Sequence, residues 1–166
     1  WMAMEWKKFG KPSALGIATG MVAGLGTITP ASGFVSPAAA LVIGLSAGVI
    51  CFYMVIFVKH KLKIDDSLDV FPVHGIGGIL GTLLAGVFAS TELGLFSGYG
   101  FAKPEYTMLD QLGVQALGVV ATFVYTALVT WVLLKLIGLF APLRVTGDEE
   151  TQGLDIALHE ERGYDL

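Results

Sequence analysis

The longest stretch without a charged residue runs from Pro12 to Val58 and contains 47 residues. As a single α-helix it would be roughly 70 Å long, more than twice the roughly 30 Å hydrocarbon core of a bilayer. The stretch must therefore be interrupted, and TPASGFVSP at residues 29–37 supplies two prolines and a glycine for the break. A content of 54% hydrophobic and 14% charged residues, with a mean hydropathy of +0.72, also predicts a membrane protein.

Two further charge-free runs, residues 70–91 and 111–134, are each long enough to cross a bilayer once. The sequence thus predicts an all-α, polytopic bundle of four transmembrane helices. The last helix is longer than a perpendicular crossing requires, so we expect it to be tilted. Residues 1–140 would form the transmembrane part, and residues 141–166 an acidic tail outside the bilayer. The expected spans are about 12–30, 36–58, 68–90 and 108–139.

Basic residues indicate the orientation of the chain. Lysines cluster at residues 7–11, before the first span, and at residues 59–63, after the second. A hairpin at residues 29–37 places both clusters on the same side, which the positive-inside rule makes cytoplasmic. Of the ten lysines and arginines, only Lys103 then lies outside. This predicts a cytoplasmic carboxy terminus, and the absence of a basic patch outside the loops argues against nucleic acid as a partner.

His74 is the residue that most needs an explanation. It stands in DDSLDVFPVHGIGGILG, residues 65–81, roughly 7–8 Å along the helix from Asp69. A polar side chain buried at that depth costs several kcal/mol unless it is paired or hydrated, so it is typical of a pathway or a polar contact. A neutral imidazole offers one donor and one acceptor, and burial would keep it uncharged. This favours a channel for a weak base without requiring one.

Asp66 and Asp69 are three residues apart, a spacing typical of a helix start, where carboxylates accept hydrogen bonds from free backbone N–H groups. Alternatively, they could bind a metal with His74 in an intramembrane enzyme. Against that, a rotation of about 100° per residue sets His74 roughly 140° from Asp69. The lone Cys51 offers no thiolate cluster, so we expect no metal and no cofactor.

Glycines spaced by four residues predict close helix packing or room for a solute. They are residues 16, 20 and 24, residues 44 and 48, and residues 77 and 81.

Three segments together resemble one known family: DDSLDVFPVHGIGG, ATGMVAGLGTITPASGFVSP and LRVTGDEETQGLDIALHEERGYDL. The chain is similar, over essentially its whole length, to the carboxy-terminal half of ammonium transporters of the Amt/Mep/Rh family, nearest to the Amt branch. The resemblance implies the last four to five helices of an eleven-helix inverted-repeat fold. It also implies a homotrimer with a twin-histidine pore in each protomer, a role in nitrogen uptake rather than catalysis, and no cofactor.

The resemblance assigns roles to six residues. His74 matches the second of the twin histidines, and Val70 a pore-lining residue one turn below it. Val22 and Thr29 fall where the family lines or supports its pore. Asp66 and Asp69 match carboxylates at the cytoplasmic start of the histidine-bearing helix.

The implied function is an ammonium channel-transporter of the cell membrane that deprotonates ammonium and conducts ammonia past His74. The resemblance further implies a tail that packs under a neighbouring subunit, and a cytoplasmic face on which a PII-type signalling protein could dock. The opening WMAMEWKKFG resembles the end of a preceding helix, so we expect the partner histidine and the gate to lie in an amino-terminal half outside this sequence. A non-conducting membrane subunit or an ammonium sensor remains an alternative.

Overall fold

The structure is a computed structural model that describes residues 1–161 and 163. Within these residues it contains helices, turns and loops and no strand, which confirms the expected all-α class. The chain divides into two compact units, residues 1–121 and 122–166, which are described separately below. In chain order the helices are α1 (Met2–Phe9), α2 (Ala14–Ile28), η1 (Thr29–Ala31), α3 (Pro37–Ile56), η2 (Phe57–Lys61), η3 (Phe71–Ile76), α4 (Gly77–Phe88), η4 (Gly94–Phe96), α5 (Met108–Ile137), α6 (Gly147–Gln152) and α7 (Leu154–His159).

Four helical stretches in the described part of the chain are long and apolar enough to cross a membrane. They are Ala14–Ala31, Pro37–Lys61, Phe71–Phe88 and Met108–Ile137, with 18, 25, 18 and 30 residues. Phe71–Phe88 and Met108–Ile137 lie within the expected ranges, whereas Ala14–Ala31 and Pro37–Lys61 end one and three residues beyond the expected limits. The four helices that the charge-free runs predicted are therefore present, and most of their ends lie a few residues inside the expected ends.

The break expected at residues 29–37 separates α2 from α3. α2 continues into the 3₁₀ turn η1, and Gly33 then takes a φ of +83°, which lets the chain reverse direction. Ser36 begins α3 by accepting a hydrogen bond from the Ala39 N–H at 3.3 Å, and Pro37 occupies the first helical position. A proline there costs nothing, because the first turn of a helix has free N–H groups in any case.

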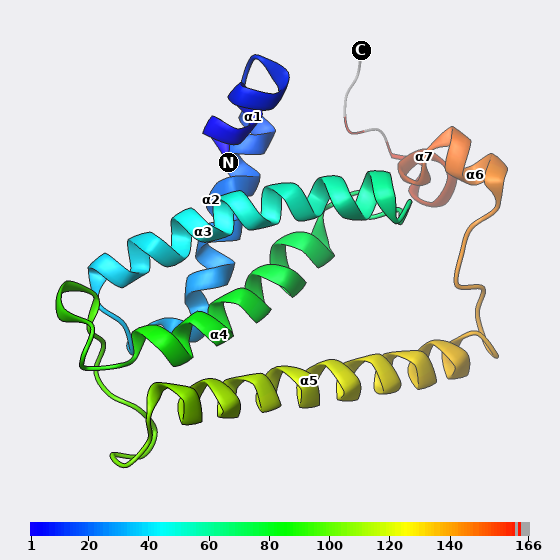
Figure 1. The fold of residues 1–166 in the computed structure, drawn as a ribbon. Coiled ribbons are helices and arrows are strands. Elements are labelled where there is room, and N and C mark those ends of the chain that lie inside the picture. The colour runs from blue at the N-terminus through cyan, green and yellow to red at the C-terminus, as the bar shows by residue number, and fades with distance from the viewer. Residues whose placement is uncertain (162, 164–166) are drawn as a thin grey trace. The chain divides into compact units, whose positions relative to one another are not determined.

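Small residues form the core of residues 1–121, where α2, α3 and α4 pack as one group (Figure 1). One buried cluster joins Ala23 of α2, Cys51 of α3 and Val73 of η3. A second joins Ala31, Ile43 and Ala85. Side chains of this size let the three helices approach closely, which matters in a bilayer because lipid provides no hydrophobic drive between helices.

The glycine spacing has a mixed outcome in this unit. Gly77 and Gly81 lie against Thr27 of α2, as helix packing requires. Gly24 and Gly44 have no atom of a neighbouring segment within 4 Å of where a Cβ would stand, so the packing interpretation does not account for them here.

In the second unit, residues 122–166, the tail forms the short helices α6 and α7. Thr146 and Glu149 make a capping box: the Thr146 N–H and hydroxyl donate to Glu149 Oε2 at 2.8 and 2.7 Å, and Thr146 Oγ1 accepts from the Glu149 N–H. These bonds to the charged carboxylate hold the pKa of Glu149 below its usual value. Arg144 also pairs with Glu150 at 2.8 Å.

Candidate functional site

His74 lies on η3, a short π-helical turn that runs directly into α4. π-helical turns are rare and occur frequently at functional sites. The imidazole faces α2, because a Cβ placed on Gly26 would lie 3.9 Å from His74 Nδ1. In this chain on its own the His74 side chain is exposed, so its expected burial in a pore stays a prediction. Burial depends on what covers this face, and the described residues leave it open.

Val22 lies on the same side of α2 as Gly26, four residues before it, and Thr29 begins η1 three residues after it. Val22 is 39% exposed, and Thr29 is also exposed. The Thr29 hydroxyl donates to the Leu25 carbonyl of its own helix at 2.7 Å. Its proton is thus engaged, while its oxygen can still accept a hydrogen bond from a solute.

Val70 immediately precedes η3, four residues before His74, and is 51% exposed. The two segments approach each other where His74 faces Gly26 and where Val73 packs against Ala23. Val22, Thr29 and Val70 lie about one turn away along the same two segments. We call this set, Val22, Gly26, Thr29, Val70 and His74, the uncovered strip. It combines apolar side chains with one imidazole and one hydroxyl oxygen.

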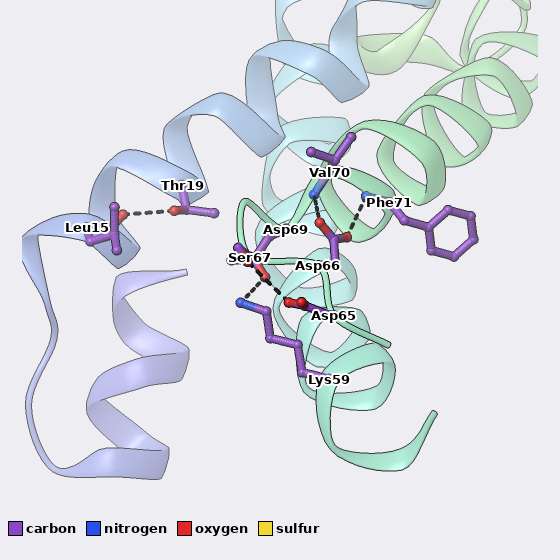
Figure 2. A network of polar contacts seen from close by, with 9 residues as sticks. All are labelled: Leu15, Thr19, Lys59, Asp65, Asp66, Ser67, Asp69, Val70 and Phe71. Carbon is purple, nitrogen blue, oxygen red and sulfur yellow. Dashed lines mark hydrogen bonds and ion pairs between the residues drawn. The ribbon is translucent and has the colours of Figure 1, made fainter. Parts of the chain in front are cut away.

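Asp66 caps the start of the His74 segment (Figure 2). Its Oδ1 accepts from the Val70 N–H at 2.8 Å and its Oδ2 from the Phe71 N–H at 2.9 Å. Both carboxylate oxygens are therefore used by backbone donors that have no partner within the helix.

Asp69 has a different role from Asp66, although the sequence suggested the same one for both. Its Oδ1 lies 2.7 Å from Lys59 Nζ of η2, an ion pair that Figure 2 shows bridging two chain segments. Its backbone is left-handed, with a φ of +56°. With Asp66 used by the backbone and Asp69 by a lysine, neither carboxylate is presented to a metal. Among the described residues, no three histidine, cysteine, aspartate or glutamate side chains gather as a metal site would need.

Thr27 is a residue of the site region that the sequence reading missed. It is fully buried between α2 and α4, where a Cβ on Gly77 would lie 2.8 Å from its hydroxyl and a Cβ on Gly81 would collide with its carbonyl oxygen. The same Cβ on Gly77 would lie 3.5 Å from Cys51 Sγ. Thr27 is next to Gly26, so this contact fixes α4 close to the point that His74 faces. The four-residue glycine spacing was the available signal, but it did not identify the neighbour.

These features define a class: a multi-pass α-helical membrane protein that carries an imidazole on an otherwise apolar, uncovered strip of its helices. The family model described as Ammonium Transporter Family matches residues 1–164, and the chain belongs to this family.

Known proteins similar to the chain are named as ammonium transporters or, in one solved structure, as an Amt sensor. An ammonium transporter of Bacillus subtilis (strain 168) is 40% identical over 164 residues, which are 99% of this chain and 40% of that protein. A putative ammonium transporter of Methanothermobacter thermautotrophicus is 48% identical over 168 residues, 100% of this chain and 40% of that protein. A solved structure titled "Sensor Amt Protein" superposes with a TM-score of 0.80 at 32% identity, over 94% of this chain and 37% of that one.

The chain spans about 40% of the length of the relatives it matches. The family assignment is confirmed, and these relatives are named as transporters rather than as enzymes.

Proposed function

We propose that this chain is the carboxy-terminal part of an ammonium channel-transporter of the cell membrane, and that the uncovered strip is one wall of its pore. The observation that carries the proposal is the position of His74, exposed on a membrane-spanning segment and facing Gly26. An imidazole that faced lipid would be expensive, so a protein segment or water must cover it. The relatives have additional length from which such a segment can come.

In this proposal ammonium loses its proton near the outer entrance, and neutral ammonia crosses the bilayer through the pore. Val22 and Val70 form an apolar wall that cannot replace the hydration shell of a cation, so the charged form is disfavoured there. His74 offers ammonia a hydrogen bond after its water is lost. The Thr29 oxygen, with its proton already donated to Leu25, can accept a hydrogen bond from the solute.

Several further features of the proposal come from the family resemblance and not from residues of this chain. They are a second histidine that pairs with His74 across the pore, a homotrimer with one pore in each subunit, and a role in nitrogen uptake. The basic clusters at residues 7–11 and 59–63 favour a cytoplasmic carboxy terminus. On that side the tail could contact a neighbouring subunit, and a PII-type protein could dock.

The first experiment measures methylammonium uptake into sealed vesicles that contain the full-length protein carrying this chain. His74→Ala should lower uptake about fivefold or change ion selectivity, because one hydrogen bond to the solute, about 1 kcal/mol, is lost. His60→Ala is the matched control, since His60 is exposed in η2 and outside the strip. Unchanged uptake and selectivity in His74→Ala would remove His74 from the pore.

A second candidate function is that of a sensor that conducts nothing. The specific observation in its favour is the structural match to a protein titled "Sensor Amt Protein". The same vesicles separate the two functions. A sensor would give no methylammonium uptake even with the native sequence, whereas a transporter would give uptake that depends on His74.

A further inference from the structure

We propose that the Lys59–Asp69 ion pair is a latch that holds His74 in register with Gly26, which makes Asp69 a positioning residue for conduction. The inference rests on the proposed function, because it concerns how the same pore is set. It assigns Asp69 a task that differs from the helix capping performed by Asp66.

The ion pair adds a charged contact between the α3 span and the turn before η3, two segments that also meet where Cys51 packs against Val73. Lys59 belongs to η2, at the end of the α3 span, and Asp69 stands two residues before η3 begins. Lys59 Nζ lies 2.7 Å from Asp69 Oδ1, and the two side chains are only 35% and 19% exposed (Figure 2). Fully exposed ion pairs contribute little because water screens them, but the restricted exposure of Asp69 reduces that screening.

The backbone around Asp69 also has an unusual conformation. Its φ of +56° is in the left-handed region, which aspartate and asparagine enter more easily than other non-glycine residues. Its N–H donates to the Asp66 carbonyl at 3.2 Å, and its own carbonyl accepts from the Val73 N–H at 3.0 Å. Asp69 is thus the residue at which the loop turns into the His74 segment, and its side chain attaches that turn to Lys59 of η2.

η3 is fastened at both of its ends. At its far end α4 is fixed on α2 by the close contacts of Gly77 and Gly81 with Thr27. At its near end Val73 packs with Ala23 of α2 and Cys51 of α3, and the ion pair of Asp69 with Lys59 adds a contact at the turn that precedes η3. His74 lies between these two points. If the ion pair is lost, the turn at Asp69 loses its charged contact with the α3 span, and we expect the backbone that carries His74 to shift relative to Gly26 within the limits set by the packing of Val73.

Asp66 and Asp65 lack this connection and provide the contrast. Asp66 binds two N–H groups of the segment it caps, so it stabilises the turn without fixing its place against α3. Asp65 is exposed and accepts a hydrogen bond from the nearby Ser67 hydroxyl at 3.2 Å. A change of charge at Asp65 should therefore leave the position of His74 unaltered.

The test compares matched variants of the full-length protein in sealed vesicles. The readout is the ratio of methylammonium uptake to ammonium uptake, per amount of folded protein. Asp69→Asn and Lys59→Met should each change the ratio about three- to fivefold, the size expected for loss of a partly exposed ion pair. Asp65→Asn and Lys61→Met remove one charge each from the same region and should leave the ratio unchanged, and Lys59→Arg should keep it close to the native value.

A background of His74→Ala distinguishes positioning from general structural damage. If the ion pair acts through His74, Asp69→Asn should not change the ratio further once His74 is alanine. An equal change in both backgrounds, or a change in Asp65→Asn as large as in Asp69→Asn, would overturn the latch. If Asp69→Asn does not insert, Lys59→Met decides the question, because it leaves the Asp69 backbone in place.

The two proposals fail in different ways. A native protein whose uptake and selectivity do not respond to His74→Ala contradicts the proposed function itself. A protein that responds to His74→Ala but not to Asp69→Asn or Lys59→Met contradicts only the latch.

Discussion

Gly81→Ala should destabilise the protein at the contact between α4 and α2. A Cβ at this position would collide with the Thr27 carbonyl oxygen and lie 2.8 Å from the Thr27 carbonyl carbon. Carbon atoms in contact are normally about 3.5–4.0 Å apart, so one backbone must move by about 1 Å. Because the obstacle is backbone, it cannot rotate away as a side chain would. Overpacking of this kind costs about 1–3 kcal/mol, and the better helix propensity of alanine offsets up to about 1 kcal/mol.

Because neither backbone can rotate away, the cost lies in the upper part of that range, about 2–3 kcal/mol. After about 1 kcal/mol is subtracted for helix propensity, the net loss is about 1–2 kcal/mol, or about five- to thirtyfold in the folding equilibrium constant. Equilibrium unfolding of the full-length protein in mixed micelles, with an increasing fraction of dodecyl sulfate, measures this free energy. Gly44→Ala is the matched control, because no neighbouring segment lies within 4 Å of its Cβ position. If Gly81→Ala unfolds at the same detergent fraction as Gly44→Ala, the close approach of α4 to Thr27 is refuted.

Two further predictions concern capping groups. Asp66→Ala should lower the free energy of unfolding in the same micelle assay by about 0.5–2 kcal/mol, because the N–H groups of Val70 and Phe71 lose their acceptors; an unchanged value would mean that water replaces the carboxylate fully. Thr146→Val should raise the pKa of Glu149, followed by NMR, towards its usual value, because the hydroxyl bond that favours the carboxylate is lost. Since the folded pKa is lowered, the capping box stabilises α6 at neutral pH and weakens as the pH falls through that pKa, and identical titrations in the two proteins would contradict this.

The sequence was sufficient for those parts of the fold that depend on local chemistry. The 47-residue charge-free run and its proline-rich break located α2 and α3, because a bilayer limits the length of one crossing. The position of Asp66 ahead of the His74 segment predicted a cap, since free N–H groups at a helix start attract carboxylates whatever else surrounds them.

Contacts between distant segments were less accessible. The ion pair of Lys59 with Asp69 depends on a loop that turns through a left-handed residue, and neither the turn nor its direction is encoded in a periodic pattern. The spacing of Gly77 and Gly81 predicted a close neighbour but could not identify Thr27 as that neighbour. The burial of His74 stays a prediction, because exposure depends on every segment that covers a residue, and the chain spans only about 40% of the length of its relatives.

The uncovered surface itself shows where additional protein is required. None of the residues in the most apolar 18-residue window of α5 is buried, yet that surface needs no protein cover, because lipid solvates apolar side chains as well as protein does. His74 and Thr29 are different, because lipid offers no partner for an imidazole or a hydroxyl oxygen. In the proposed function, the polar members of the uncovered strip therefore mark the face that further protein and a water-stripped solute would share. Exposed leucines and valines elsewhere on the helices carry no such information.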